Sequence, residues 1–397
     1  MRDSLLHIST IAVMLAAGFG FGGNLYAADA PNGKKPAPAP SSNCCPTPCP
    51  PKPCEPPCPV QTCCVKNPGE ALCAGELKCA YNAPARVEVS CGWDFFGSAS
   101  FLYWQPRQTK FYVATLDEVT PTPPANVPRF THLVDFDYKY QPGFKLAAGY
   151  RLPYDNWVIA AEWTWLHATQ TTSASADAPE HLEPWFIFPF TSGNATDVRN
   201  KWHYGFDIVD VALSRPFYSS TRFVMTPFVG GRLFFNHQHL NGRYTYNLAT
   251  PPGSGPFFDE TVHINVEAWE LGPRIGTNGT WLVGSGFAFT GDVGFSVLYA
   301  SFDMKYRQFG NNATQSTALN VSDSRTVDTF LPNMDMSFGL RWGTYINCNK
   351  QHIGFAAKYD FLYFWGNSMV TEYSALELNG QGDLTLQGLT LNANMDF

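Results

Sequence analysis

Charged side chains are scarce in this chain. Asp, Glu, Lys and Arg together make up 15% of the residues, whereas soluble globular domains use about a quarter. The formal net charge is -7 and no Lys/Arg-rich run is present, which argues against a nucleic-acid-binding protein. Beyond residue 30, no apolar stretch reaches the roughly 18 residues of a membrane-spanning helix. The composition therefore disfavours an ordinary soluble enzyme and a helical membrane protein.

Motifs of catalysis are missing as well. The sequence contains no Walker A run, no H-E-x-x-H and no Rossmann glycine fingerprint. His132, His181, His237 and His239 fall in expected loops and form no pattern of a catalytic site. We therefore expect no enzymatic activity, no cofactor and no metal site.

Aromatic residues are abundant instead, with 31 Phe, 18 Tyr and 11 Trp. The mean hydropathy is nevertheless only -0.17, so apolar residues are interleaved with polar ones. This combination is expected where alternate side chains of a strand face lipid.

Residues 1–30 have the features of a secretory signal peptide. Arg2 precedes an apolar stretch over residues 5–21, and Ala28-Asp29-Ala30 matches the A-x-A cleavage pattern. The alternative is an N-terminal membrane anchor, for which this glycine-broken run is short. We expect an exported protein.

Residues 31–90 form a Pro- and Cys-rich arm that we expect to be disordered and extended, because proline excludes helix and central strand. Clustered cysteines in an exported chain predict disulfides; zinc binding is the alternative, disfavoured by the prolines within "CPTPC" and "CEPPC". Cys348 makes the total odd, which suggests cross-links between molecules, the alternative being a local disulfide knot. The disulfide candidates are Cys44, Cys45, Cys49, Cys54, Cys58, Cys63, Cys64, Cys73, Cys79, Cys91 and Cys348.

Residues 91–397 contain about ten segments in which apolar and polar side chains alternate, the signature of strands with one apolar face. We predict an all-β fold: a transmembrane antiparallel up-and-down barrel of about ten strands, with twelve as the alternative. A soluble β-sandwich also alternates, but these segments are long and carry Trp and Tyr at their ends. The predicted strands cover residues 93–103, 143–152, 157–165, 202–208, 223–235, 261–277, 287–299, 333–342, 353–365 and 389–397.

Short and long connections alternate between the predicted strands. Short ones are expected near 153–156, 215–221, 276–284 and 347–351, and long ones near 105–140, 169–199, 236–260, 309–325 and 366–387. Short periplasmic turns and long outer loops are typical of bacterial outer-membrane barrels. An even strand number puts the arm and the C-terminus in the periplasm, on the same side as Cys348.

Charged side chains on the polar faces are the candidate lumen lining. Their signs nearly balance, so they could line a small aqueous pore or pair across the lumen and close it. In 202–208 the alternation predicts Trp202, Tyr204 and Phe206 toward lipid, and a phase shift near Ala268 predicts a β-bulge. The lumen candidates are Lys145, Arg151, Glu162, Asp207, Arg232, Glu270, Arg274, Asp292, Asp335, Arg341, Lys358 and Asp360.

The last segment, "LTLNANMDF", predicts a closing strand with Asn392, Asn394 and Asp396 toward the lumen. Its apolar face and terminal aromatic residue resemble the signal by which the barrel-assembly machinery recognises outer-membrane proteins. The residues of this predicted signal are Leu389, Leu391, Ala393, Met395 and Phe397.

Three stretches carry a resemblance to a known family: "GWDFFGSASFLYWQPRQ", "PGFKLAAGYRLPYDNWVIAAEWTWLH" and "TPFVGGRLFFNHQHL". Over roughly 91–397 the chain resembles the Legionella-type major outer-membrane protein family, with relatives in Chlamydia-like bacteria. The resemblance implies a pore-forming barrel, sometimes disulfide-linked, and no catalytic residues; the Pro/Cys arm does not map onto it.

We therefore predict a porin-like outer-membrane protein that passes small hydrophilic solutes and reinforces the envelope through disulfide cross-links. The alternative is a closed structural or adhesion barrel with loops 105–140 and 169–199 as its contact surface. The expected partners are outer-membrane lipid, the barrel-assembly machinery, and disulfide-linked copies or other Cys-rich envelope proteins, without nucleic acid.

Overall fold

A computed structural model describes residues 85–89, 92–118, 129–153, 155–177, 180–187, 195–246, 259–311, 319–373 and 381–397. The predicted signal peptide and most of the arm, including its nine cysteines, lie outside these residues, as does Cys91. The helical structure in the described part is a short 3-10 segment, η2 (Met369–Tyr373). No helix in this part is long and apolar enough to cross a membrane.

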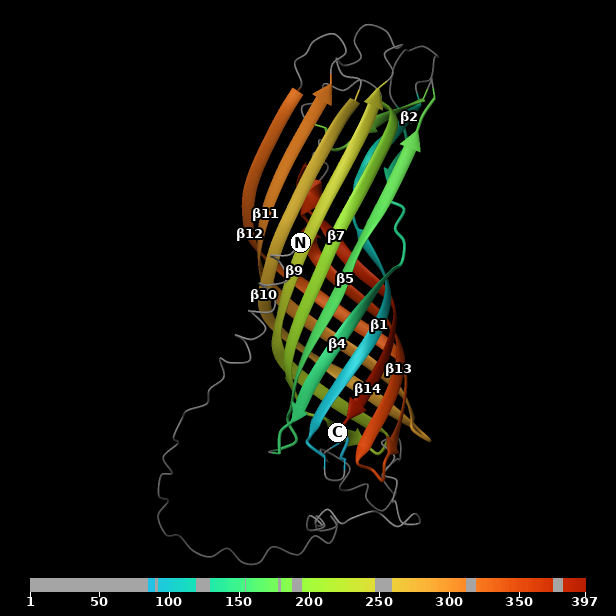
Figure 1. Ribbon diagram of the computed structural model, residues 1–397, viewed down its shortest axis with the longest axis vertical. Helices are drawn as coiled ribbons and strands as arrows, with labels where there is room; N and C mark the ends of the chain where they lie inside the picture. The colour runs from blue at the N-terminus through green and yellow to red at the C-terminus, as the bar shows by residue number, and fades with distance from the viewer. Residues whose placement is uncertain are drawn as a thin grey trace, which may run out of the picture. The chain divides into compact units, whose positions relative to one another are not determined.

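Ten long strands form a closed antiparallel barrel (Figure 1). Each strand pairs with its neighbours in chain order, β7 pairs with β9, and β14 pairs with β1 to close the ring. This confirms the predicted all-β barrel over the β-sandwich. The ten strands are β1 (Phe95–Gln108), β4 (Gln141–Arg151), β5 (Val158–Ser175), β7 (Ala195–Ser214), β9 (Phe223–Tyr246), β10 (Asp259–Gly284), β11 (Phe287–Asn311), β12 (Leu319–Ile346), β13 (Gln351–Ser368) and β14 (Gly382–Asp396).

Each of the ten predicted segments overlaps one barrel strand. Most strands run well beyond the predicted segment, and they occupy part of every predicted long connection. Four short strands were not predicted: β2 (Tyr112–Glu118), β3 (Arg129–Asp135), β6 (Glu180–Pro184) and β8 (Phe217–Ser220). β2 pairs with both β3 and β6, so two predicted loops fold against each other.

Tight turns gather at the end of the barrel where Phe397 lies. Asp155 and Asn156, in the turn between β4 and β5, have φ of 54° and 59°, a left-handed conformation that Asp and Asn tolerate. Phe397 pairs through its backbone with Trp93 and Phe95, with N···O distances of 3.1 and 3.0 Å. We call this the terminal end of the barrel; Figure 1 shows the C-terminus there and β2 at the opposite end.

The predicted short connection at 276–284 is wrong. These residues continue β10, and the tight turn follows at Ser285 and Gly286, both with positive φ. A Cβ at Gly276 would lie 2.4 Å from the ring of Phe228. The glycine is therefore needed for close packing within the strand, not for a turn.

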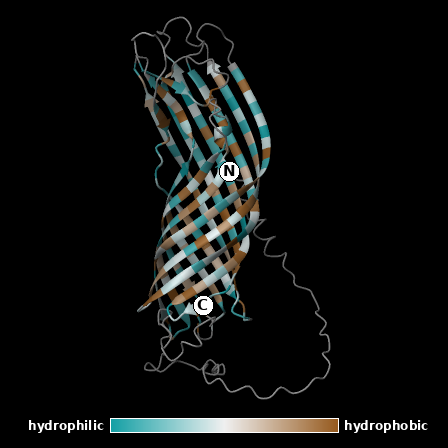
Figure 2. Ribbon diagram, turned by 180° about the vertical axis from the view of Figure 1, so that it is seen from behind, coloured by the Kyte–Doolittle hydropathy of each residue, from teal (hydrophilic) through white to brown (hydrophobic). Residues whose placement is uncertain are grey.

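An apolar band surrounds the half of the barrel nearer the terminal end. On β11 every second side chain from Phe287 to Tyr299, glycine excepted, is a large apolar group exposed on the outer surface. Trp269, Tyr299 and Phe330 from three adjacent strands form an aromatic row at its upper edge, with ring centroids 5.7 and 5.4 Å apart. Figure 2 shows the alternation of apolar and polar residues along the strands. Such a band with an aromatic row is the lipid-facing surface of an outer-membrane barrel.

Above this band the apolar face changes sides. Val262, Ile264 and Val266 of β10 point inward and are completely buried, whereas Trp269 and Leu271 point outward. The predicted β-bulge near Ala268 is wrong, because β9 and β10 keep one register from Asp259 to Trp281. β10 therefore keeps its register where it passes beyond the lipid-facing band. Only the polarity of its two faces is exchanged: the outward face becomes polar and the inward face apolar.

At the end opposite the terminal end, the described parts of two inter-strand connections fold into the barrel as a plug, which we define as residues 109–118, 129–140 and 180–187. The Phe111 ring packs against Phe136 and Trp202, with centroid distances of 4.6 and 5.4 Å. The Tyr306 hydroxyl of β11 donates a hydrogen bond to the carbonyl of Phe186 at 2.8 Å. The plug therefore touches β7 and β11, two barrel strands that are not neighbours, and shares one hydrophobic core with the wall.

Candidate functional site in the barrel lumen

A cavity of about 400 Å³ lies inside the barrel at the level of the apolar band. Side chains from all ten barrel strands line it. Eight of the twelve predicted lumen residues are among them: Lys145, Glu162, Arg232, Arg274, Asp292, Asp335, Lys358 and Asp360.

Two arginines and two aspartates form an ion network on one wall of the cavity. Arg232 donates two hydrogen bonds to Asp210, at 2.7 and 2.8 Å, and its third nitrogen lies 3.0 Å from Asp335. Arg274 donates to the other oxygen of Asp335 at 2.6 Å. Bidentate pairs of this kind hold charges in fixed positions.

Gly294 leaves the space that this network needs. It lies on β11, between Arg274 on β10 and Asp335 on β12. A Cβ at Gly294 would come within 2.7 Å of the Asp335 carboxylate and 2.9 Å of the Arg274 guanidinium. Its missing side chain therefore allows two strands that are not neighbours to pair their charges.

The lysines make the remaining ion pairs of the cavity. Lys145 lies 3.3 Å from Asp360 and 3.5 Å from Glu162. Lys358 lies 2.7 Å from Asp292. Every cationic side chain that lines the cavity thus has a carboxylate partner, as charges removed from water require.

Above the cavity, side chains meet directly across the lumen. The rings of Phe234 on β9 and Phe364 on β13 lie 4.8 Å apart. A layer of buried amides follows, in which Gln238 donates to Asn236 at 3.0 Å and Asn236 donates to Asn367 at 2.8 Å. Asn367 donates to Glu270, a predicted lumen residue, at 2.5 Å. These layers separate the cavity from the plug.

At the terminal end the predicted residue Arg151 is buried against Asp396, and its guanidinium donates to that carboxylate. The other Asp396 oxygen lies 2.6 Å from Nδ1 of His352, which is also buried. Arg341 lies in the same region, within electrostatic range of Asp396 and Arg151. This cluster joins β4, β13 and β14 near the closing seam.

Asp207 was predicted to line the lumen, and this prediction is wrong. Its neighbours Ile208 and Asp210 line the cavity in alternation, so Asp207 points to the outer surface. There Trp163 Nε1 donates to its carboxylate at 3.1 Å, and His167 Nε2 lies 2.6 Å away. Trp202, Tyr204 and Phe206, predicted to face lipid, are instead buried inside the barrel. The cause is the polarity exchange above the apolar band, which falls within β7.

Sequence reasoning missed Asp210 and the amide layer. Asp210 lies two residues beyond the predicted strand 202–208, and only the correct phase of β7 would have placed it inward. Gln238, Asn236 and Asn367 are neutral, and they fall in regions predicted as loops. Contacts between distant strands, rather than any local pattern, bring them together.

The other predicted sites remain predictions. Cys348 is a free thiol, half buried in the turn between β12 and β13 at the terminal end; its ten candidate partners lie outside the described residues. In the predicted assembly signal, Leu389 and Leu391 are exposed on the outer surface of β14. Within the described residues, no group of three or more His, Cys, Asp or Glu side chains is placed to hold a metal ion.

Some solved structures resemble the chain weakly. The toluene transporter TodX of Pseudomonas putida shares 9% identity, covering 76% of this chain and 89% of its own, with a TM-score of 0.24. A Pseudomonas aeruginosa FadL homologue shares 8% identity, with coverages of 77% and 90% and a TM-score of 0.24. The toluene transporter TbuX of Ralstonia pickettii shares 10%, with coverages of 84% and 99% and a TM-score of 0.24. Similarity at this level carries no conclusion about function.

No curated protein matches the chain. A family model described as the Legionella pneumophila major outer membrane protein precursor matches residues 88–397, which contain all ten barrel strands, the charged cavity and the plug. The chain therefore belongs to this family of outer-membrane proteins, as the resemblance in its sequence implied.

Proposed function

We propose that the protein is a gated channel for small hydrophilic solutes in the bacterial outer membrane. The observation that carries this proposal is the charge-lined cavity at the level of the lipid-facing band. Apolar side chains would be sufficient to fill the interior of a narrow barrel. Here four basic side chains, each paired with a carboxylate, instead give the lumen a polar lining along which a hydrophilic solute could pass. Paired charges of both signs suit small polar solutes without strong selection by charge.

The plug is the proposed gate. In the conformation described here, the aromatic and amide layers and the plug fill the lumen above the cavity. β6 is joined to the barrel wall by a single backbone pair, Leu182 with Ala195. Side-chain packing therefore provides most of the attachment of β6. Outward movement of the plug, together with rotation of the Phe234 and Phe364 rings and of the amide side chains, would open the path while the barrel stays closed as a sheet.

The proposed orientation places the terminal end in the periplasm and the plug on the outer side. The tight turns at the terminal end support it, since bacterial barrels have short periplasmic turns. The proposed partners are outer-membrane lipid, the barrel-assembly machinery, and copies or other Cys-rich envelope proteins joined through disulfides that reinforce the envelope. We propose no catalytic role.

Planar-bilayer recording tests the channel. We expect the purified wild-type protein to show discrete ohmic steps that are rare and brief. The double variant F111A/F186A removes two buried rings of the plug, so its steps should be more frequent and last longer. L133A, which truncates an exposed side chain of β3, is the matched control and should behave as wild type.

The second candidate function is a closed barrel with a structural or adhesive role. It is favoured by the mutual pairing of the lumen charges, which is also what a permanently closed lumen requires. Absence of conductance from folded wild-type protein and from folded F111A/F186A would contradict the channel and support this alternative.

A further inference from the structure

The outer surface beyond the apolar band carries a cationic patch on β7, β9, β10 and β11. Outward-facing residues of these strands pair across the sheet in three consecutive rows that contain no acidic side chain. Acidic residues flank the rows, with Asp197 and Asp259 above and Glu267 and Asp303 below. The five basic residues of the rows are Arg199, Lys201, Arg243, Lys305 and Arg307.

Three of the five basic residues have no ion-pair partner in the described part of the chain: Arg199, Lys201 and Arg307. Arg243 lies 3.0 Å from Asp259, and Lys305 lies 3.2 Å from Asp303. Arg199 stands directly opposite Arg243 in the β7–β9 register. Like charges placed opposite each other destabilise a sheet, and an anion bound between the strands would reduce this repulsion.

Three histidines complete the same rows. His203 lies opposite His239, with ring centroids 6.1 Å apart, and the His263 ring is 6.3 Å from that of His239. Nδ1 of His263 lies 2.5 Å from the Asn241 side-chain oxygen, and Nδ1 of His239 contacts the oxygen of Asn265 in the same way. Because these oxygens accept, each Nδ1 donates, and Nε2 lies on the opposite side of the ring.

A row of oriented imidazoles can also suggest a metal site. The charge around these rings disfavours it. Burial, followed by Lys201 and His239, lowers the pKa of His203, and burial, followed by His239 and Arg307, lowers the pKa of His263. Both residues lie on strand segments above the lipid-facing band. The local potential is therefore positive, which repels metal cations and attracts anions.

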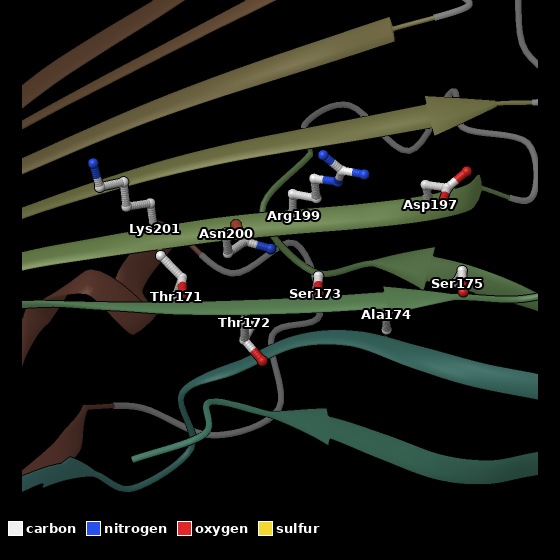
Figure 3. A pocket seen from close by; sticks show the side chains of 9 residues that line it. All are labelled: Thr171, Thr172, Ser173, Ala174, Ser175, Asp197, Arg199, Asn200 and Lys201. Carbon is white, nitrogen blue, oxygen red and sulfur yellow. The ribbon is translucent and has the colours of Figure 1, made fainter. Parts of the chain in front are cut away.

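Hydroxyl groups of β5 extend the patch. Figure 3 shows Thr171 and Ser173 on the same side of the sheet as Arg199 and Lys201, in the groove between β5 and β7, while Thr172 points the other way. Thr171 pairs with Lys201 and Ser173 with Arg199. Guanidinium, ammonium and hydroxyl donors side by side form a common arrangement for binding phosphate oxygens.

The position of the patch relative to the membrane identifies its ligand. Trp269 lies at the edge of the apolar band that is farther from the terminal end. The nearest row of the patch contains Asn265, four residues from Trp269 along β10. A strand advances about 7 Å for every two residues, so the row lies close above the band. We propose that the patch binds the phosphorylated headgroups of outer-leaflet glycolipids, whose acyl chains lie against the apolar band. This inference rests on the orientation proposed above, in which the patch faces the outer leaflet.

Binding to lipid A tests this inference. Full-length protein in a non-ionic detergent is titrated with mixed micelles containing diphosphorylated lipid A, and binding is followed by native mass spectrometry. In the triple variant R199Q/K201Q/R307Q the affinity should fall at least about tenfold. The control R215Q/R222Q/K350Q removes the same charge at the terminal end and should bind as wild type. Circular dichroism and heat-modified gel mobility confirm that each variant is folded.

Lowering the pH should strengthen binding, because protonation of His203 and His263 adds positive charge to the rows. The pKa values of His203 and His263 are lowered, so the gain should grow as the pH falls from about 7 to about 5. Other groups that face the patch are His237 of β9 and His167 of β5, beside Glu267, Asp303, Asp197 and Asp259.

Four results would overturn the inference. If dephosphorylated lipid A binds as well as the diphosphorylated form, the apolar band alone accounts for the binding and the patch does not recognise phosphate. Equal affinity for inorganic phosphate would identify a free-anion site. Preferential binding of dextran sulfate would point to soluble polyanions, and unchanged affinity of the folded triple variant would exclude the patch. Conductance is not measured, so failure of the proposed channel is distinguishable from failure of this site.

Discussion

At the scale of single residues, the buried charges near the closing seam carry the clearest energetic consequences. Asp396 is 3% exposed and is held by Arg151 and His352 on two other strands. Removing one partner of a buried ion pair leaves the other charge without compensation, which costs far more than an exposed pair contributes.

We expect D396N to lower the free energy of unfolding by about 3–5 kcal/mol, because Arg151 keeps its buried charge. The matched control is D155N, which breaks the pair of Asp155 with Arg215. That pair is largely exposed, so its loss should cost less than about 1 kcal/mol. Urea unfolding in lipid vesicles, followed by tryptophan fluorescence, measures both values. Equal losses would show that the seam cluster is not an interacting unit.

At the scale of one strand, β10 shows how the same alternation serves two environments. Near the terminal end its outward side chains face lipid, and beyond Trp269 its inward side chains form the core. The variant V266N places an amide in this core and should lower the free energy of unfolding by about 2–4 kcal/mol. E267N changes the adjacent outward residue to the same side chain and should cost less than about 1 kcal/mol.

The comparison of V266N with E267N distinguishes a regular β10 from a β10 with a bulge near Ala268. A bulge near Ala268 would make Val266 lipid-facing, and V266N and E267N would then exchange their effects. Urea unfolding in vesicles again provides the measurement.

The same strand explains how much the sequence could predict. Alternation located all ten barrel strands, because lipid on one side and ordered side chains on the other impose a period of two. It could not identify which face is apolar at each height, so Asp207 was assigned to the wrong face. The plug and the amide layer depend on contacts such as Phe111 with Trp202 and Asn236 with Asn367, which no local pattern encodes.

At the scale of the whole molecule, the location of Cys348 makes cross-linking through the arm testable. Cys348 lies in a turn at the same end of the barrel as residue 92, where the described barrel segment begins. We expect non-reducing electrophoresis of cell envelopes to show disulfide-linked oligomers that reducing agent converts to monomer. C348S should weaken the oligomer bands, and a serine substitution within the arm provides the comparison.

Two results would contradict this prediction. The first is a single monomer band under both conditions. The second is quantitative alkylation of Cys348 in non-reduced envelopes, since a thiol already in a disulfide does not react.

The exchange of polarity along the barrel also determines how the protein would behave outside the membrane. A detergent belt would end at the row of Trp269, Tyr299 and Phe330, because the wall beyond it has a polar exterior and a packed interior. The parts of β7, β9, β10 and β11 beyond this row would thus remain uncovered, with the surface chemistry of an ordinary soluble protein. These uncovered parts are the surface on which a crystal lattice or an antibody fragment would find its contacts.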